Sequence, residues 1–254
     1  MNEGARRQII VTGGGTGIGR EIARALAADG ANALLLGRRA ETLAQAAANL
    51  RAQVPGAQIA WRACDIGAVE QVEALARWFG AEGPGELDVL VNNAGGVEPL
   101  ADDAPLAEAA AWARRILANN LLGTYLITRA LAPYLRRPGG RVINLSSIAA
   151  VRGGGDMYSA AKAGVIGLTY SLAGDLAAAG ITVNAIAPGL TLETEFFGDR
   201  MTEERLRRTL AQIPAGRPGH PADIAAAARY LASPDAAYVT GQVLHVNGGW
   251  IFGR

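Results

Sequence analysis

The sequence predicts an α/β fold in which seven parallel strands form one doubly wound sheet with helices on both faces. Short apolar segments recur along the chain, alanine-rich segments with helical spacing separate most of them, and a glycine-rich turn follows the first. This alternation is typical of βαβ units, whose strands are buried on both sides. The predicted strands are Ile9–Val11, Ala33–Leu36, Ile59–Arg62, Val89–Val91, Val142–Leu145, Val183–Ile186 and Val243–Val246.

Helices are predicted between these strands, and two of them are long. The long segments Leu106–Leu135 and Tyr158–Ala178 are expected to form a central helix pair. The least regular segment is Leu190–Pro218, which we expect to act as a lid over the site. Because no repeat, linker or break in composition appears, we expect residues 1–254 to form a single domain.

Composition narrows the classes of partner. The chain has 24 basic and 23 acidic side chains, so it carries no basic field suited to nucleic acid or to anionic lipid. Its single cysteine, Cys64, cannot form an intramolecular disulfide, which fits a reducing compartment. The N-terminus does not resemble a signal peptide, and no apolar segment approaches the ~18 residues of a membrane span. We therefore expect a soluble, cytoplasmic protein with a small-molecule partner.

The turn after the first strand runs from Thr12 to Gly19 and leads into an alanine-rich helix. Glycines let the backbone approach a pyrophosphate closely, and the helix N-terminus supplies free N–H groups. Glycine turns also cap ordinary structural junctions, but a strand, glycine turn and helix in this order favour a Rossmann-type nucleotide site. The residues expected to contact the cofactor here are Gly13, Gly15, Thr16, Gly17, Ile18 and Gly19.

The glycine spacing and several later motifs resemble the short-chain dehydrogenase/reductase family. The motifs are Asn92-Asn93-Ala94-Gly95, Ser147, Tyr158 with Lys162, Pro188-Gly189 and Val246-Asn247-Gly248-Gly249. The resemblance spans essentially the whole chain. The C-terminal segments, from Gly216 to Ile224 and from Thr240 to Gly249, are most similar to bacterial 3-oxoacyl-acyl-carrier-protein reductases and related alcohol dehydrogenases.

The resemblance implies a catalytic group of Asn120, Ser147, Tyr158 and Lys162. Tyr158 would pass a proton to or from the substrate oxygen, which Ser147 would hydrogen-bond. Lys162 lies four residues after Tyr158, hence on the same helix face, where its ammonium would stabilise the phenolate. Asn120 would hold a water that links Lys162 to solvent. A purely structural, helix-packing Tyr158 is the alternative.

Two neighbouring residues compete for these roles, and one interval is short. Asn119 adjoins Asn120 and Ser146 adjoins Ser147, but the family pattern selects the second residue of each pair and makes Ser146 structural. Tyr158 follows Ser147 by 11 positions, two fewer than in most relatives. The glycine-rich turn 152–156 is expected to absorb the deletion and to reshape one wall of the substrate pocket.

The end of the second strand indicates which nicotinamide cofactor binds. Gly37 stands where relatives that use NAD place an acid, so nothing repels a 2′-phosphate, and the Arg38 guanidinium can bind one. We therefore expect NADP(H), with Arg39 beside Arg38. Thr16 stands where many NADP-using relatives carry a second basic residue, which leaves NAD(H) open. Alternatively, both arginines are solvated charges that open a helix.

The resemblance assigns further cofactor contacts. Asp65 would bind the adenine amino group, although an Asp here can also serve as a helix N-cap. Asn93 is expected to be structural, bridging strands beneath the cofactor. For the nicotinamide, the sequence does not choose between Thr191 and Thr194. The other expected contacts are Ile66, Asn92, Ala94, Gly95, Tyr158, Lys162, Pro188, Gly189 and Leu190.

These features together predict an NADP(H)-dependent oxidoreductase that acts on a ketone, an oxoacyl group or a secondary alcohol. The alternatives are an NAD-dependent alcohol or sugar dehydrogenase and a nucleotide-sensing regulator on the same fold. The resemblance also implies a homotetramer. His220 and His245 have no neighbours with metal-ligand spacing, so no metal is expected and both are interpreted as structural.

Overall fold

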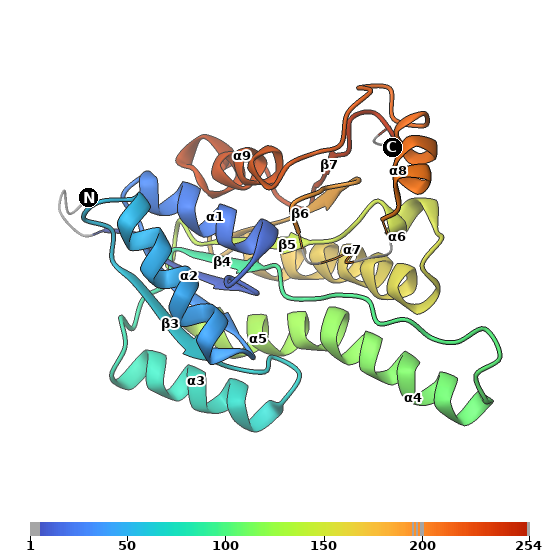
Figure 1. Ribbon diagram of the computed structural model, residues 1–254. Helices are drawn as coiled ribbons and strands as arrows, with labels where there is room; N and C mark the ends of the chain where they lie inside the picture. The colour runs from blue at the N-terminus through green and yellow to red at the C-terminus, as the bar shows by residue number, and fades with distance from the viewer. Residues whose placement is uncertain (1–5, 195, 197, 199–200, 253–254) are drawn as a thin grey trace.

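The computed structural model describes residues 6–194, 196, 198 and 201–252 and contains a single parallel sheet in the order β3-β2-β1-β4-β5-β6-β7 (Figure 1). All seven predicted strands are confirmed, with ends that shift by at most two residues. The strands are β1 Gln8–Thr12, β2 Asn32–Gly37, β3 Ile59–Ala63, β4 Val89–Asn92, β5 Arg141–Leu145, β6 Thr182–Pro188 and β7 Val243–Val246.

The helices confirm the βαβ alternation. The predicted helical segment Leu106–Leu135 is confirmed through Tyr134, and it contains a π-helical turn, Ala118–Leu122, between α4 and α5 and ends in a 3₁₀ turn. The second long helix is confirmed as α7, which packs against α4. The α-helices are α1 Gly17–Ala28, α2 Ala40–Gln53, α3 Val69–Ala81, α4 Leu106–Leu117, α5 Gly123–Leu131, α6 Ala149–Arg152, α7 Asp156–Ala177, α8 Glu203–Leu210 and α9 Pro221–Ala232.

Apolar side chains from the strands alternate between two cores. Ile9 and Val11 of β1 pack in the core that contains residues of α1, α2 and α9, whereas Ile10 packs with α3, α5 and α7. Strand side chains alternate between faces with a period of two, so a strand that is apolar throughout has both faces covered. Figure 1 shows α1, α2 and α9 together on one side of the sheet, with α3 and α5 on the other.

The strand order reverses between β1 and β4, and Asn93 spans that reversal. Its Nδ2 donates to the carbonyl oxygens of Thr12 at 2.9 Å and Gly13 at 3.2 Å. The Thr12 hydroxyl in turn accepts N–H bonds from Asn93 and Ala94. As predicted, Asn93 is a bridge between strands. Because the loops after β1 and β4 diverge here, the carboxyl edge of the sheet offers a crevice, the usual ligand position in doubly wound folds.

A buried polar chain connects β4 and β5 to the helices on one face. Asn92 Nδ2 donates to Thr128 Oγ1 of α5 at 2.7 Å and to Asn144 Oδ1 of β5 at 2.8 Å. Asn144 Nδ2 donates to Thr169 Oγ1 of α7 at 2.9 Å. Asn92 Oδ1 accepts no hydrogen bond from the described residues, but the three bonds of the chain resist displacement, because breaking one leaves further desolvated polar groups without a partner. This chain therefore fixes α7 relative to the strands beside it.

The irregular segment 190–218 is partly helical, because it contains α8. Positions 195, 197, 199 and 200 of this segment lie outside the described residues, as do residues 1–5 and 253–254 of the expected domain. Cys64 is a buried free thiol. None of the helices in the described part of the chain is long and apolar enough to cross a bilayer.

Gly19 of α1 is predicted to be intolerant of a side chain. A Cβ there would overlap the Gly13 carbonyl oxygen and the Asn93 amide, which belong to the strand bridge and cannot move freely. Gly19→Ala should therefore lower the free energy of unfolding by about 2 kcal/mol, measured by urea denaturation. Gly37→Ala is the matched control, because its nearest contact would be an ordinary 3.5 Å. Equal stability of the two variants would contradict this explanation.

Candidate active site

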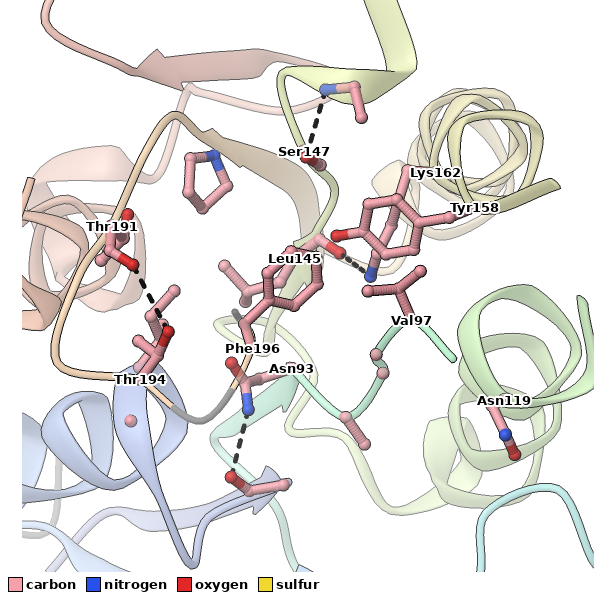
Figure 2. A pocket seen from close by; sticks show the side chains of 18 of the residues that line it. Asn93, Val97, Asn119, Leu145, Ser147, Tyr158, Lys162, Thr191, Thr194 and Phe196 are labelled. Carbon is pink, nitrogen blue, oxygen red and sulfur yellow. Dashed lines mark hydrogen bonds between the residues drawn. The ribbon is translucent and has the colours of Figure 1, made fainter. Parts of the chain in front are cut away.

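One cavity of about 870 Å³ lies at the carboxyl edge of the sheet. It extends from the glycine turn and the end of β2 to the loops that follow β4, β5 and β6. The start of α7 and the C-terminal segment complete its wall. Figure 2 shows the side chains of α7 and of the loops converging there. The cavity brings together nearly all of the predicted site residues.

The glycine turn forms one end of the cavity. Gly13 and Gly17 have positive φ values of 64° and 48°, a conformation that favours glycine. The predicted turn residues Gly13, Gly15, Thr16, Gly17 and Ile18 all line the cavity. Gly19 does not line it, and its lack of a side chain serves the close approach of α1 to β1 instead. Gly19 thus has a packing role, and the cofactor contact expected there stays a prediction.

The ends of β2 and β3 supply the neighbouring wall. Arg38 and Arg39 are exposed and line the cavity, and no described carboxylate forms an ion pair with Arg38. Asp65 and Ile66 also line it. The N-cap alternative for Asp65 is wrong, because α3 begins after Ala68 and the Asp65 carboxylate accepts the Gly67 N–H at 2.9 Å. Asp65 thus closes a turn before the helix and still borders the cavity.

The loop after β4 supplies part of the cavity wall, whereas Asn92, whose backbone is expected beside the cofactor, lies outside the lining. Ala94 and Gly95 line the cavity, as does Asn93. Asn92 does not, because its side chain is buried in the polar chain with Thr128 and Asn144. The family motif therefore contains one core residue.

The loop after β6 contributes the residues expected beside the nicotinamide. Pro188, Gly189 and Leu190 line the cavity, and so do both candidate threonines. Thr191 is buried, and its hydroxyl donates to the Gly189 carbonyl at 3.3 Å. The Thr194 hydroxyl donates to the Thr191 carbonyl at 3.3 Å, and its side chain lies against Gly17 of the glycine turn (Figure 2). Thr194 thus links the two ends of the cavity.

Tyr158 and Lys162 lie on one face of α7, in its first two turns, and both are buried. Lys162 Nζ donates to the Leu145 carbonyl at the end of β5 at 2.8 Å and lies 5.8 Å from the centroid of the Tyr158 ring (Figure 2). Lys162 is the only lysine in the chain; the other 23 basic side chains are arginines. Its position is thus determined jointly by α7 and β5.

The two serines that follow β5 have separate environments. Ser146 is buried, and its hydroxyl donates to the Lys162 carbonyl at 2.8 Å, which supports a structural role. Ser147 is partly exposed at the cavity wall, and its Oγ accepts the Ala149 N–H at 3.1 Å. The Ser147 hydroxyl is also within hydrogen-bonding reach of the Tyr158 side chain, so the two hydroxyl groups lie together at the cavity wall.

Asn120 is completely buried in the π-helical segment beside Lys162. Its Nδ2 donates to the Gly96 carbonyl at 2.8 Å, and its Oδ1 accepts the Gly96 N–H at 3.0 Å. A Cβ at Gly95 would lie 2.5 Å from Asn120 Oδ1 and 3.2 Å from Lys162 Nζ. Only glycine leaves room for these two polar groups to lie side by side. Asn119, in contrast, lines the cavity close to Gly67.

Burial shifts the pKa values of both titratable groups. It lowers the pKa of the Lys162 ammonium to about 8, because the charged form loses its hydration. Burial also raises the pKa of Tyr158 to about 12, while the Ser147 hydroxyl acts in the opposite direction with a smaller effect. The expected lowering of the tyrosine pKa by the ammonium therefore does not dominate. At neutral pH Tyr158 keeps its proton.

Several cavity residues were not predicted from the sequence. The Phe196 ring, from the irregular segment, lies 5.4 Å from the Tyr158 ring at an angle of 52° (Figure 2). Arg152 and Trp250 also line the cavity. The only sequence feature that pointed to Phe196 was its position in the expected lid. Arg152 was marked only by its position in the shortened turn. Trp250 follows the closing glycine motif but had no distinguishing signal.

Neither histidine contributes to the cavity lining. His220 Nδ1 lies 3.1 Å from Glu193 Oε1, at the start of α9, and His245 lies within β7. Across residues 6–194, 196, 198 and 201–252, no three His, Cys, Asp or Glu side chains gather as they would around a metal ion.

Comparison with known proteins identifies the family. The family profile described as Enoyl-(Acyl carrier protein) reductase matches residues 13–251. The chain is 40% identical to Nodulation protein G of Rhizobium sp. (strain N33), with 98% of each chain covered. It is 38% identical to a 3-oxoacyl-[acyl-carrier-protein] reductase of Vibrio cholerae, with 94% of this chain and 95% of the relative covered. The chain belongs to the short-chain dehydrogenase/reductase family.

Solved structures of this family have the same fold. A short-chain dehydrogenase/reductase from Mycobacterium ulcerans superposes with a TM-score of 0.87 at 31% identity, covering 96% of this chain and 89% of the other. Actinorhodin polyketide ketoreductase, in a variant solved with NADPH, has a TM-score of 0.85 at 35% identity and covers 96% and 97% of the two chains. As a short-chain dehydrogenase/reductase, the chain is an oxidoreductase that acts on CH–OH and C=O groups.

The single lysine allows a direct test of the site electrostatics. Protein labelled with ¹⁵N-lysine should show one side-chain amine signal, which should titrate with a pKa of about 8 instead of the ordinary 10.5. Burial is the physical reason, since it disfavours the charged amine. A measured pKa of 10 or more would contradict the buried environment.

The same pKa difference links Lys162 to stability. The pKa is lower in the folded than in the unfolded chain, so the charged amine destabilises the fold below pH 8 and this effect is relieved as the pH rises from about 8 to about 10.5. The Lys162→Met variant lacks the buried amine, so its free energy of unfolding at pH 7 should be about 1–3 kcal/mol higher than that of the wild type. The same variant is the control for the ¹⁵N-lysine experiment, because its amine signal should be absent.

Proposed function

We propose that the chain is an NADP(H)-dependent reductase of ketones or oxoacyl groups, able to oxidise the corresponding secondary alcohols, with Tyr158 as general acid and base. The side chains of Ser147, Tyr158 and Lys162 line the same cavity as the glycine turn and Arg38. Tyr158 could therefore donate a proton to a carbonyl oxygen in the same cavity in which the glycine turn would bind a dinucleotide phosphate.

The lining fits a dinucleotide. The glycine turn places backbone at the N-terminus of α1, where N–H groups and the helix dipole favour a pyrophosphate. Gly37 presents no carboxylate to the adenosine ribose, and Arg38 offers a guanidinium fork for a 2′-phosphate. The relative solved with NADPH supports the same cofactor, which supplies or accepts the hydride when bound. NAD(H) is the alternative, since Thr16 offers no second positive charge.

Tyr158 and Ser147 would act together on the substrate oxygen. A carbonyl gains negative charge on oxygen as it is reduced, and donors aimed at that oxygen stabilise the charge. Ser147 donates one hydrogen bond, and Tyr158 donates a second and then transfers its proton. The raised pKa of Tyr158, about 12, keeps this proton in place at neutral pH, as the reductive direction requires.

Lys162 and Asn120 would support the tyrosine. The Lys162 amine is held by the Leu145 carbonyl, close to the tyrosine ring and to the cofactor end of the cavity. Asn120 bonds both backbone groups of Gly96, so it positions the loop that borders the lysine. We infer that Asn120 is a positioning residue and that a water held nearby renews the proton through Lys162.

The segment 190–218 would act as a lid, with Phe196 covering the Tyr158 ring and excluding water. We infer a single domain that comprises residues 1–254, because the cavity is built from loops along the whole length of the sheet. A cytoplasmic homotetramer is the assembly that the family resemblance implies.

Tyr158→Phe should reduce kcat for ketone reduction by at least about 10²-fold, because it removes the hydroxyl proton and little else. NADPH oxidation is followed at 340 nm with a panel of ketones and oxoacyl thioesters. Titration with NADPH, monitored by nucleotide fluorescence, should give a similar Kd for the variant and the wild type. Tyr170→Phe, on the exposed part of the same helix, is the matched control. Retained turnover in Tyr158→Phe would remove the tyrosine from its proposed role.

Arg38→Asp should weaken NADPH binding by about 10- to 100-fold and improve NADH binding, because the carboxylate repels the 2′-phosphate and can pair with ribose hydroxyls. The ratio of the two Kd values, measured by calorimetry, is the readout. Arg20→Asp is the control, because it makes the same change of charge on α1, at an exposed residue that does not line the cavity. An unchanged ratio in Arg38→Asp would show that the phosphate binds elsewhere.

A further inference from the structure

Arg152 is the last residue of α6 and lines the same cavity as Tyr158 and Ser147. Its guanidinium carbon lies 4.7 Å from the centroid of the Trp250 ring. Its Nη2 donates to Gln212 Oε1 at 2.6 Å. Three segments far apart in the sequence therefore orient one exposed arginine at the wall of the cavity.

The closing Asn-Gly-Gly motif builds this arrangement. Asn247 Nδ2 donates to the Ile251 carbonyl at 2.9 Å, and this bond closes a turn that contains Trp250. The Ala215 N–H donates to the Gly248 carbonyl at 2.9 Å, so the segment after α8 lies against the same turn. This turn thus places Trp250 and the segment that contains Gln212 next to each other, where both can contact the Arg152 guanidinium.

The contacts of Arg152 leave its positive charge uncompensated. Gln212 and Trp250 are both neutral, and no carboxylate in the described part of the chain pairs with Arg152. Glu98, which also lines the cavity, pairs with Arg115, whose Nε lies 3.1 Å from the carboxylate. This wall is therefore cationic.

Stacking on an indole ring covers one face of a guanidinium but leaves its edge of N–H donors available. Gln212 uses one of these donors. A guanidinium that is already oriented loses less entropy when it binds an anion, and its planar fork matches carboxylate and phosphate oxygens. The same cavity also has apolar lining residues, among them Val97, Ile148, Phe196 and Met201. Apolar surroundings strengthen an interaction between charges.

We propose that Arg152, oriented by Trp250, binds an anionic group of the carbonyl substrate. The enzyme then prefers an oxo acid, or an oxoacyl thioester whose carrier arm bears phosphate, over the corresponding neutral ketone. The inference rests on the proposed reductase function and names a substrate class for it. Arg152 lies between Ser147 and Tyr158 in the sequence, so this cation is close in the chain to the proposed proton donor.

Two matched substrate pairs separate the sources of the anion. Acetoacetate and methyl acetoacetate differ by a carboxylate, whereas acetoacetyl-coenzyme A and the acetoacetyl thioester of N-acetylcysteamine differ by the phosphate-bearing arm. The readout is the ratio of kcat/KM for the charged member to that for the neutral member. The wild type should show a ratio of about 10 or more for one of the pairs.

Arg152→Gln should lower this ratio about tenfold, and Arg152→Lys should retain part of it, because lysine keeps the charge without the fork. Arg207→Gln is the matched control, since it removes one positive charge from exposed α8 without touching the cavity lining. Titration with NADPH confirms that each variant is folded.

The outcomes distinguish the two proposals. Turnover of all four compounds without preference for an anion, or an equal ratio in Arg152→Gln and the wild type, overturns the role of Arg152 and leaves the reductase function standing. Absence of turnover with every compound overturns the reductase function and the inference with it.

Discussion

The amine of Lys162 is buried at the carboxyl edge of the sheet and needs hydrogen-bond partners there. Several neighbouring residues are arranged so that these partners can reach it. The Leu145 carbonyl accepts one of its hydrogen bonds, and Gly95 has no side chain that would separate the amine from Asn120. A buried cation is unfavourable unless such partners are fixed in advance. Burial lowers the pKa of this amine to about 8, because the charged form loses its hydration.

The buried polar chain in the core keeps the surroundings of Lys162 rigid. Asn92, Asn144 and two threonines join β4 and β5 to α5 and α7 through hydrogen bonds in the core. Because α7 cannot slide along the sheet without breaking these bonds, Tyr158 keeps its position relative to Ser147. The hydrogen bonds between strands and helices thus hold the two proposed catalytic residues in place.

Some features of the cavity could be predicted from local sequence, and others could not. The glycine turn could be recognised from its residues, since positive φ values at Gly13 and Gly17 require glycine wherever such a turn occurs. Asn92 belongs to the same family motif as Gly95, yet it faces the core, because side chains alternate between faces along a strand. The helical segment expected over 106–135 is present, but its π-helical turn was not predicted. Alanine-rich spacing does not reveal the π-helical turn that places Asn120 beside Gly96.

The sequence by itself determined the strands, their alternation with helices, the glycine turn and the pairing of Tyr158 with Lys162, because each depends on residues close together in the chain. Only the tertiary structure decided that Phe196 covers the tyrosine and that Arg152 meets Trp250 and Gln212. These contacts join loops separated by 38 to 98 positions, and short-range patterns carry no information about which loops meet. Strand order and packing bring such loops together, so the shape and charge of the substrate pocket emerge only in the folded chain.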